Sequence, residues 1–465
     1  MRIFCAHSAL TTTIFSNKMN STIKLSHGCE FVIDRLEKHG FEAFAVGGWV
    51  RDSLLGINPK DFDVTTNALP QDVKNAFADC KTVDTGIKHG TVTVIKYGEQ
   101  IEVTSYRTDG KYLDCRRPES VVFGVSLDED LMRRDFTVNA MAFNDKTGVV
   151  DLFGGIADIE NKIIRCVGNP DKRFSEDALR IIRALRFAAV YGFETEEKTA
   201  RAIHKNKELL KNIAAERIFA ELSRLVCGDF AGRLLLEFCD VFSVFIPNLA
   251  DCERLFLTGK NHAQTLLSHT ARALDAASPR LDLRLAMLLH DIAKPQCMTV
   301  DNDGNQHFSS HAELSAVIAR EILKSLKAPS KLIDKVGILI EYHDVGCDAD
   351  EREIKRLMRK IGRDNTLLIF TEIRRADISA QNGADRQRRL EHIKKCAKIA
   401  KRLIDENACT SVSQLAVSGG DLIAVGMKQG REIGNVLETL LDRVIDGTVQ
   451  NEKGALLQAV KNEYL

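Results

Sequence analysis

The stretch "KDFDVTT", residues 60–66, decides the fold. If it is a β-strand, its side chains alternate between the two faces, so Asp61 and Asp63 share one face. Two carboxylates held this close repel each other unless a cation lies between them. The pattern therefore predicts one of two things. It is either a site for Mg²⁺ and a phosphate-bearing substrate, or a solvated strand edge with its charges pointing outward.

Length and composition describe an ordinary globular protein. The chain has 465 residues, enough for about two to four domains. Its formal net charge is zero, so a surface for nucleic acid must be a local patch. Twelve cysteines without a C-x-x-C pair argue against a disulfide framework or zinc ribbon and fit a reducing compartment. No apolar run reaches membrane-spanning length, so we expect a cytoplasmic protein without a membrane partner.

The first 29 residues contain no acid and include a Ser/Thr-rich run. This composition predicts either a short organelle-targeting segment or an upstream start codon, with Met19 beginning the natural protein. We favour the second interpretation.

Short apolar runs alternate with turn residues from about 27 to 165, which predicts a mixed α+β unit. Residues 91–106 read as a hairpin that turns at Gly98. The segments 48–56 and 70–79 read as short helices. After Gly168 the apolar residues recur with a period near 3.6, so the rest of the chain is predicted to be helical, in at least two packing units.

The stretch "VGGWVRDSLLG", residues 46–56, precedes the paired aspartates. Gly47 and Gly48 follow an apolar strand and open a helix, where backbone N–H groups suit a phosphate. Arg51, one turn later, can reach the same phosphates. Glu102, on the second arm of the hairpin, is the candidate third carboxylate of a metal site; its alternative is a surface strand position.

Five motifs in order resemble one family: "VGGWVRD", "DFDVTT", "RRDFTVNAMAF", "DLFGGIADI" and "EDALRIIRALRF". They resemble those of the tRNA nucleotidyltransferases, the CCA-adding enzymes of the bacterial and eukaryotic type, which have a polymerase-β-like head. Residues 418–457 are also similar to the tail of bacterial members. The resemblance implies metal-binding roles for Asp61 and Asp63. It implies triphosphate contacts for Gly48 and Arg51, and ribose and phosphate contacts for Arg134 and Asp135.

The segment "EDALRIIRALRF", residues 176–187, is predicted to be one helix. At about 100° per residue, Asp177, Arg180, Arg183 and Arg186 fall on one side of it. The alternatives are a solvated basic face and a nucleotide-selecting face. Cytosine and adenine both present an exocyclic amine beside an unprotonated ring nitrogen, which Asp177 and Arg180 could read as acceptor and donor. The family resemblance implies the same role for this pair.

The segment 107–130 is polar and turn-rich, and we expect a mobile loop. In the resembling family this loop serves the switch from C to A addition and is shortened in enzymes that add only C. Its length here argues against a CC-only enzyme and leaves an A-only enzyme open.

A set of histidines and aspartates in the second half resembles the HD phosphohydrolase pattern. Imidazole and carboxylate are ligands for divalent transition metals. The alternative is a scaffold that keeps the fold without a metal. Basic runs at 352–363 and 386–402 are either solvated faces or contacts to the tRNA backbone. The candidate metal ligands are His269, His290, Asp291 and Asp377, with His311 and His343 in the same pattern.

These inferences combine into an α+β fold, a polymerase-β-like head followed by helical neck, body and tail. The expected boundaries are an N-terminal extension at 1–26, a head at 27–165, a neck with the nucleotide-selecting helix at 166–240, an HD-like body at 241–400 and a tRNA-binding tail at 401–465. The expected reaction is Mg²⁺-dependent transfer of CMP and then AMP from CTP and ATP to the tRNA 3′ end. The rivals are an A-adding enzyme, a poly(A) polymerase, and an HD phosphohydrolase whose head only binds RNA.

Overall fold

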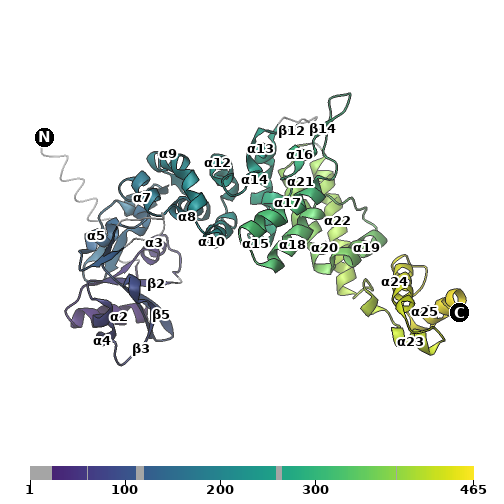
Figure 1. Cartoon of the computed structure of the whole chain (residues 1–465), viewed down its shortest axis with the longest axis horizontal. Helices are drawn as coiled ribbons and strands as arrows, with labels where there is room; N and C mark the ends of the chain where they lie inside the picture. Colours follow the sequence, from purple (N-terminus) through teal and green to yellow (C-terminus); the bar gives the residue numbers. More distant parts are fainter. Residues whose placement is uncertain (1–22, 60, 111–119, 258–263, 384) are drawn as a thin grey trace. The chain divides into compact units, whose positions relative to one another are not determined.

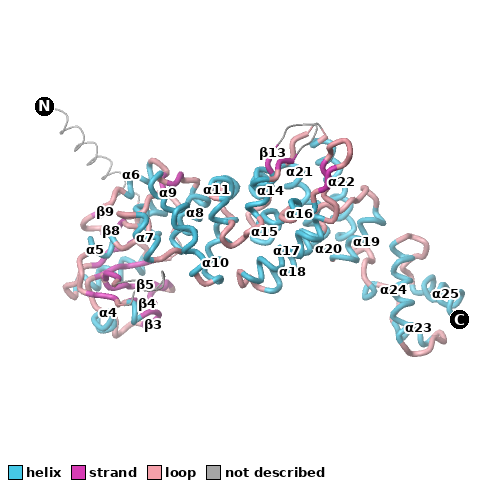
Figure 2. Tube along the Cα trace, turned by 45° about the horizontal axis from the view of Figure 1, so that its top comes forward, coloured by secondary structure: helices cyan, strands magenta, loops and turns pink. Residues whose placement is uncertain are grey.

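The computed structural model describes residues 23–465 except 60, 111–119, 258–263 and 384. Two compact units divide the chain, residues 1–230 and residues 231–465. The main sheet belongs to the first unit, and the second unit consists mainly of helices joined by loops (Figures 1 and 2). The expected N-terminal extension, for which an organelle-targeting segment and an upstream start codon are the two interpretations, lies outside the described residues except for positions 23–26.

A seven-stranded sheet is the centre of the first unit, in the order β3-β4-β5-β2-β1-β8-β9. Neighbouring strands are antiparallel except β2 and β5, which are parallel. The stretch "KDFDVTT" contains the central strand β2, and the predicted hairpin is β4–β5, with Gly98 at a φ of 80° in its turn. The strands are β1 (Ala43–Val46), β2 (Phe62–Thr66), β3 (Lys81–Gly86), β4 (Thr91–Lys96), β5 (Glu99–Ser105), β8 (Met141–Asn144) and β9 (Gly148–Asp151).

Short helices pack on this sheet. Helix α2 (His27–Lys38) lies against β1, β2, β4 and β5 because its buried residues, Cys29, Val32, Ile33 and Leu36, recur at helical spacing. The two predicted short helices are confirmed as α3 (Gly48–Leu54) and α4 (Pro70–Ala76).

The segment 107–130 is only partly a loop. Its ends pair as β6 (Arg107–Asp109) and β7 (Val121–Phe123), and α5 (Leu127–Met132) follows with a capping box from Ser126. Residues 111–119, between the paired strands, lie outside the described residues.

The helical part of the first unit corrects one prediction. Residues 176–187 are not one helix, because Asp177 is extended, with φ −139° and ψ 102°, and separates α7 from α8. Asp177 is therefore not on the helix face that carries the three arginines. The elements here are α6 (Gly155–Glu160), α7 (Pro170–Glu176), α8 (Leu179–Tyr191), α9 (Glu197–Asn206) and α10 (Ala215–Val226), with the two-residue strands β10 (Ile163–Ile164) and β11 (Glu194–Thr195).

The second unit is helical as predicted, apart from two short ladders that the sequence analysis missed. These are β12 (Phe256–Leu257) with β13 (Gln264–Thr265), and β14 (Thr299–Val300) with β15 (Gln306–His307). The helices are α11 (Ala231–Glu237), α12 (Cys239–Phe242), α13 (Leu249–Arg254), α14 (Leu266–Ala276), α15 (Leu281–Leu289), α16 (Lys294–Cys297), α17 (His311–Ser325), α18 (Ser330–Glu341), α19 (Glu351–Ile361), α20 (Arg363–Leu368), α21 (Arg374–Ala380), α22 (Arg386–Asp405), α23 (Gly419–Ala424), α24 (Arg431–Ile445) and α25 (Lys453–Tyr464).

The last three helices share a hydrophobic cluster of their own, around Leu422, Leu440 and Leu456. Arginines of the basic run 352–363 reach across to them. Arg356 pairs with Asp446 at 2.6 Å, and Arg359 pairs with Glu438 at 2.6 Å. These arginines of the basic run therefore have partners within the chain.

Candidate active site and a buried histidine centre

Three carboxylates gather at the centre of the sheet. Asp63 on β2 lies directly opposite Glu102 on β5 in the parallel register, so both side chains leave the same face. Asp61 immediately precedes β2, two residues before Asp63, and is exposed. The sequence-based prediction that Glu102 adjoins the paired aspartates is confirmed.

The surroundings make Asp63 hard to ionise. Burial raises the pKa of Asp63 to about 6; Arg134 opposes this shift, and the carboxylates of Glu102 and Asp61 add to it. A group of three acids with one raised pKa is the arrangement that a bound cation relieves.

Two cavities meet at these aspartates, because Asp61 and Asp63 line both. The first, of about 600 Å³, is otherwise lined by Gly47, Gly48, Arg51, Arg134, Asp135, Asn139, Arg183, Arg186, Phe187, Val190, Tyr191 and Arg224. The second, of about 590 Å³, is otherwise lined by Phe62, Thr85, Thr93, Gly98, Glu99, Gln100 and Glu102. We call them the arginine-lined cavity and the hairpin cavity.

Arg51 is fixed in the wall of the arginine-lined cavity. Its guanidinium donates to Asp52 at 2.8 and 2.9 Å, to the Tyr191 hydroxyl at 2.7 Å, and to the Asn139 amide oxygen. Gly47 has a φ of 76°, which favours glycine, and a Cβ there would lie 3.0 Å from the guanidinium of Arg134. The backbone before α3 thus passes close to the cationic lining.

Asp135 is buried and holds one of the arginines of α8. Arg183 donates two hydrogen bonds to Asp135 Oδ2, at 2.7 and 2.9 Å, and Asn139 donates to Oδ1 at 3.1 Å. Burial alone would raise the pKa of Asp135, but Arg183 and Asn139 hold this pKa well below the usual carboxyl range. Asp135 therefore remains an anion that orients Arg183.

Glu221 on α10 supports the same row of arginines. It lies 3.2 Å from Arg186 and 3.5 Å from Arg183. Burial lowers the pKa of Arg186 to about 10, and Glu221 opposes this shift. A solvated basic face is excluded for Arg186, whose side chain is 9% exposed.

Asp177 and Arg180 have other partners and are not among the described residues that line the arginine-lined cavity. Asp177 accepts a hydrogen bond from Arg217 at 3.0 Å and from the backbone N–H of Leu179 at 3.1 Å. Arg180 donates to Glu176 at 3.0 Å and to the carbonyl of Arg133 at 3.0 Å. The two side chains do not bond to each other, because Asp177 lies outside the helix.

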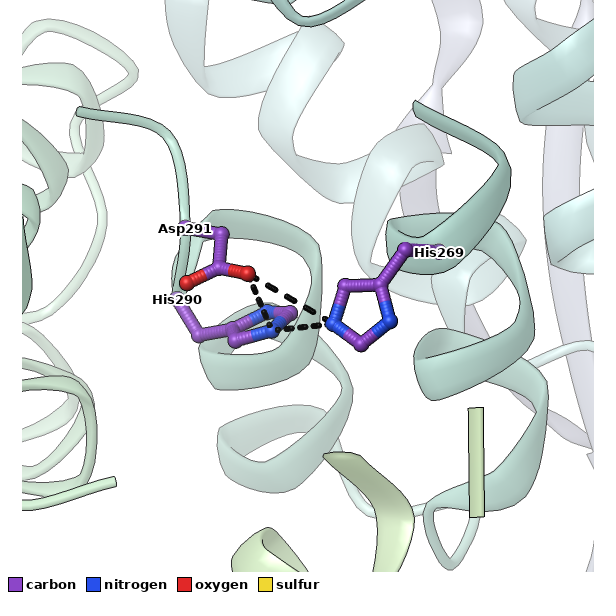
Figure 3. A group of neighbouring side chains, drawn as sticks. All are labelled: His269, His290 and Asp291. Atoms are coloured by element: carbon purple, nitrogen blue, oxygen red, sulfur yellow. Dashed lines mark hydrogen bonds and ion pairs between the residues drawn. The ribbon is translucent and has the colours of Figure 1, made fainter. Parts of the chain in front are cut away.

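The second unit contains a buried histidine centre, shown in part in Figure 3. Nε2 of His269, on α14, lies 3.2 Å from Nε2 of His290. Oδ2 of Asp291 also lies 3.2 Å from Nε2 of His290. His290 and Asp291 directly follow Leu289, the last residue of α15. Asp377 Oδ1, from α21, lies 3.0 Å from His269 Nε2.

The remaining two histidines of the predicted pattern complete the centre. His311 and His343 place Nε2 3.3 Å apart, and each Nε2 lies 3.4 Å from Asp291 Oδ1. The donor atoms form two groups, which share Asp291 and each fit within 4.8 Å. One group is His269, His290 and Asp291; the other is Asp291, His311 and His343.

Three of the four histidine rings of this centre are oriented as metal ligands. Nδ1 of His290, His311 and His343 each faces a backbone carbonyl three residues earlier, at 2.7 to 2.8 Å, and donates its proton there. In the neutral rings, Nε2 then presents a lone pair to the centre. Asp291 Oδ1 is buried and accepts no hydrogen bond from the described residues. The donor set therefore fits one or two divalent transition metals.

Charge within the centre is strongly coupled. Burial opposes protonation of His290, but the carboxylates of Asp291 and Asp377 raise its pKa to about 10. Burial likewise disfavours the Asp291 anion, yet His290 and Lys294 hold its pKa well below the usual range. Lys294 contacts Asp291 at 2.7 Å. Cations thus stabilise the carboxylates, and a metal would compete with protons for the same atoms.

Sequence reasoning missed several residues of the arginine-lined cavity, among them Asn139, Tyr191 and Arg224. It also missed Glu221, for which a signal existed. Glu221 occupies a position in the buried stripe of α10, beside Ile218 and Leu225. A carboxylate in an apolar stripe requires a partner.

Among the described residues, no helix is both long and apolar enough to cross a membrane. Family models match three segments. The model of the poly A polymerase head domain matches residues 43–165. The model of an RNA- and SrmB-binding site of polymerase A matches residues 192–252. The model of tRNA nucleotidyltransferase domain 2 matches residues 306–460.

Whole-chain relatives agree with these matches. The CCA-adding enzyme of Lactobacillus helveticus is 34% identical over 91% of this chain and 94% of its own, and that of Geobacillus stearothermophilus is 35% identical over 91% and 93%. The solved structure of Bacillus stearothermophilus CCA-adding enzyme in complex with CTP is 31% identical, with a TM-score of 0.70 over 93% of this chain and 95% of that one. The chain therefore belongs to the CCA-adding enzyme family of tRNA nucleotidyltransferases.

Proposed function

We propose that this protein adds the 3′-terminal CCA to tRNA, using CTP and ATP and releasing pyrophosphate. The observation that carries the proposal is the placement of Asp63 opposite Glu102, with Asp61 beside them, at the wall of a cavity lined by arginines. The whole-chain relatives are CCA-adding enzymes, which favours this activity over that of a poly(A) polymerase.

We assign the catalytic role to the three carboxylates. Asp61 and Asp63, with Glu102 beside them, would hold divalent metal, for which we propose Mg²⁺. Such a metal would activate the tRNA 3′ hydroxyl and neutralise the leaving pyrophosphate. The alternative function is an HD phosphohydrolase whose head only binds RNA. RNA binding alone does not require three neighbouring carboxylates, one of which has a raised pKa.

The arginine-lined cavity is the proposed nucleotide site. Arg51 and Arg134 would contact the triphosphate near Gly47 and Gly48, where a side chain would obstruct the approach. Asp135 would act by orienting Arg183. The hairpin cavity, which the same aspartates line, would receive the RNA end.

We propose that Asp177 and Arg180 select the base. Cytosine and adenine each present an exocyclic amine and an unprotonated ring nitrogen. A carboxylate can accept a hydrogen bond from the amine, and a guanidinium can donate one to the ring nitrogen. To contact a base in this way, Asp177 must break its hydrogen bond with Arg217, and Arg180 must break its hydrogen bond with Glu176. Nucleotide binding is therefore expected to change the partners of both side chains.

One assay tests the addition reaction. tRNA lacking its last three nucleotides is incubated with Mg²⁺ and labelled CTP, ATP or both, and the 3′ ends are sequenced. We expect two C residues with CTP alone and CCA with both. Addition of A only to tRNA ending in CC would identify an A-adding enzyme. A long A tail would identify a poly(A) polymerase.

A second candidate function rests on the histidine centre, whose donor atoms form two groups that share Asp291. We propose that it binds divalent transition metal and hydrolyses a phosphate ester. The test is hydrolysis of 2′,3′-cyclic nucleotides with Mn²⁺, Ni²⁺ or Co²⁺ by the wild type and His290→Ala. Hydrolysis that is lost in the variant, with CMP addition retained, supports the proposal; absence of hydrolysis and of bound metal in the wild type identifies a scaffold.

A further inference from the structure

A second cluster of cationic side chains lies in the second unit, outside the nucleotide site. It lines a cavity of about 280 Å³ formed by Arg374 and Ile378 of α21 and by Arg388, Arg389, His392 and Ile393 of α22. Three lining residues are permanent cations, and none of the described lining residues is an acid. We call it the α21–α22 cavity. Its volume is near the lower end of small-molecule sites, which span roughly 300–1,000 Å³.

Hydrogen bonds of one glutamine connect the lining of the cavity to the histidine centre. Gln381 donates from Nε2 to both carboxylate oxygens of Asp377, at 3.0 Å each. Its Oε1 accepts a hydrogen bond from Arg389. Arg374 also lies three residues before Asp377 on α21, so the two side chains are neighbours on one helix face.

Arginines fixed in this way suit an oxyanion. Arg374 donates to the carbonyl of Val345, and Arg389 is oriented by Gln381, so neither must be ordered when an anion arrives. His392 donates to the carbonyl of Cys347 at 2.9 Å. Arg388 is the exposed member of the set: its side chain is 80% exposed and pairs with Asp385 at 3.3 Å. Planar guanidinium groups bind phosphate oxygens in pairs.

We propose that the α21–α22 cavity binds a phosphate group of a small phosphate ester whose reacting phosphate lies at the histidine centre. This inference rests on the second proposed function. It narrows the substrate class to esters that carry a second, non-reacting phosphate, such as a nucleoside 2′,3′-cyclic phosphate with a 5′-phosphate.

The first arm of the test measures binding without hydrolysis. The full-length protein carries ¹³C-labelled histidine, the His392 signal is assigned with His392→Gln, and inorganic phosphate is titrated. We expect a saturable shift of this signal, with affinity lowered about tenfold or more in Arg388→Ala and in Arg389→Gln, since each removes charge-assisted hydrogen bonds. The matched control is Arg254→Ala, because Arg254 is 79% exposed and pairs with Asp251 three residues earlier, as Arg388 does with Asp385.

The second arm uses the Mn²⁺-loaded protein and two cyclic nucleotides, with and without a 5′-phosphate. Arg388→Ala should raise KM about tenfold or more for the 5′-phosphorylated substrate and leave kcat unchanged, with no change for the other substrate. If phosphate binds but nothing is hydrolysed, the second proposed function fails and the cavity is an anion site of another kind. If phosphate leaves the His392 signal unmoved while tRNA shifts it, the cavity faces RNA and the inference is overturned.

Discussion

Asp63 and Glu102 stand directly opposite each other on parallel strands that are separated by two further strands in sequence order. Opposite residues of neighbouring strands lie about 5 Å apart at the backbone, so the two carboxylates share one small space. Because the pair forms only when β5 returns beside β2, its geometry depends on the hairpin as a whole.

Removing a member of this pair should abolish the reaction and spare RNA binding. In Asp63→Asn and Glu102→Gln, which keep the side-chain shape, we expect incorporation of both CMP and AMP to fall by a factor of about 10³ or more. The check is initial rate on tRNA lacking its 3′ end, with tRNA affinity measured by gel shift. Near-normal CMP addition by Asp63→Asn would remove the metal site from this position.

The raised pKa of Asp63 gives a second prediction. Because the pKa of Asp63 is about 6 in the folded state against 3.8 for an ordinary aspartate, the unfolded state ionises first, and stability in the absence of metal falls as the pH rises from about 4 to about 6 and stays low above 6. In EDTA, Asp63→Asn should therefore raise Tm at pH 7.5 and raise it less at pH 4.5. Thermal melts with added Mg²⁺ provide the control, since the metal should reduce this difference at pH 7.5.

Glu221 should matter through the arginines that it holds. Glu221→Ala leaves Arg186 buried without its acid, which costs roughly 3 kcal/mol of unfolding free energy. We expect KM for CTP and for ATP to rise together, because Arg183 and Arg186 line the cavity that we propose as the site for both nucleotides. Glu221→Gln should recover part of the lost stability, and an unchanged KM in a folded Glu221→Ala would contradict the assignment.

Base selection can be tested at Asp177 and Arg180. If they read the base, Asp177→Ala should lower discrimination against UTP and GTP about 5- to 150-fold, the effect of one good bidentate base contact. Arg180→Ala should lower use of CTP and ATP together. The measurement is relative kcat/KM for the four nucleotides. Unchanged ratios in both variants would mean that these side chains serve only their present partners, Arg217 and Glu176.

Metal content tests the histidine centre directly. The two ligand groups predict up to two divalent ions per chain in the wild type, none in Asp291→Ala and one in His343→Ala. The count is made by elemental analysis after loading with Mn²⁺ and dialysis. Because protons compete for the same atoms and the pKa of His290 is raised to about 10, loading should weaken progressively as the pH falls, starting above the ordinary range of imidazole. Equal counts in all three proteins would place the metal elsewhere.

Local rules predicted much of the head. The alternation of polar and apolar side chains in residues 60–66 and the turn at Gly98 predicted that Asp63 and Glu102 lie on strands. The structure shows that these two strands are neighbours in the sheet. Helical periodicity placed α8 and α10. It could not foresee the break at Asp177, because an extended residue inside a periodic segment depends on tertiary partners such as Arg217.

The contacts of Glu221 were beyond sequence reasoning. The pairing of Glu221 with Arg183 and Arg186 joins residues 35 to 38 positions apart, and no local propensity encodes it. The histidine pattern did predict a cluster, but not that Asp291 would stand between two ligand groups. That placement arises because α15 ends at Leu289, which turns adjacent residues toward different neighbours.

The common wall formed by Asp61 and Asp63 bears on the order of events in a repeated reaction. Both cavities are lined by these two aspartates, so each cavity gives its own access to the same carboxylates. If the nucleotide binds in the arginine-lined cavity and the RNA end in the hairpin cavity, as proposed, the two reactants do not compete for one space. Replacement of pyrophosphate by the next nucleotide then does not require the RNA end to leave its own cavity.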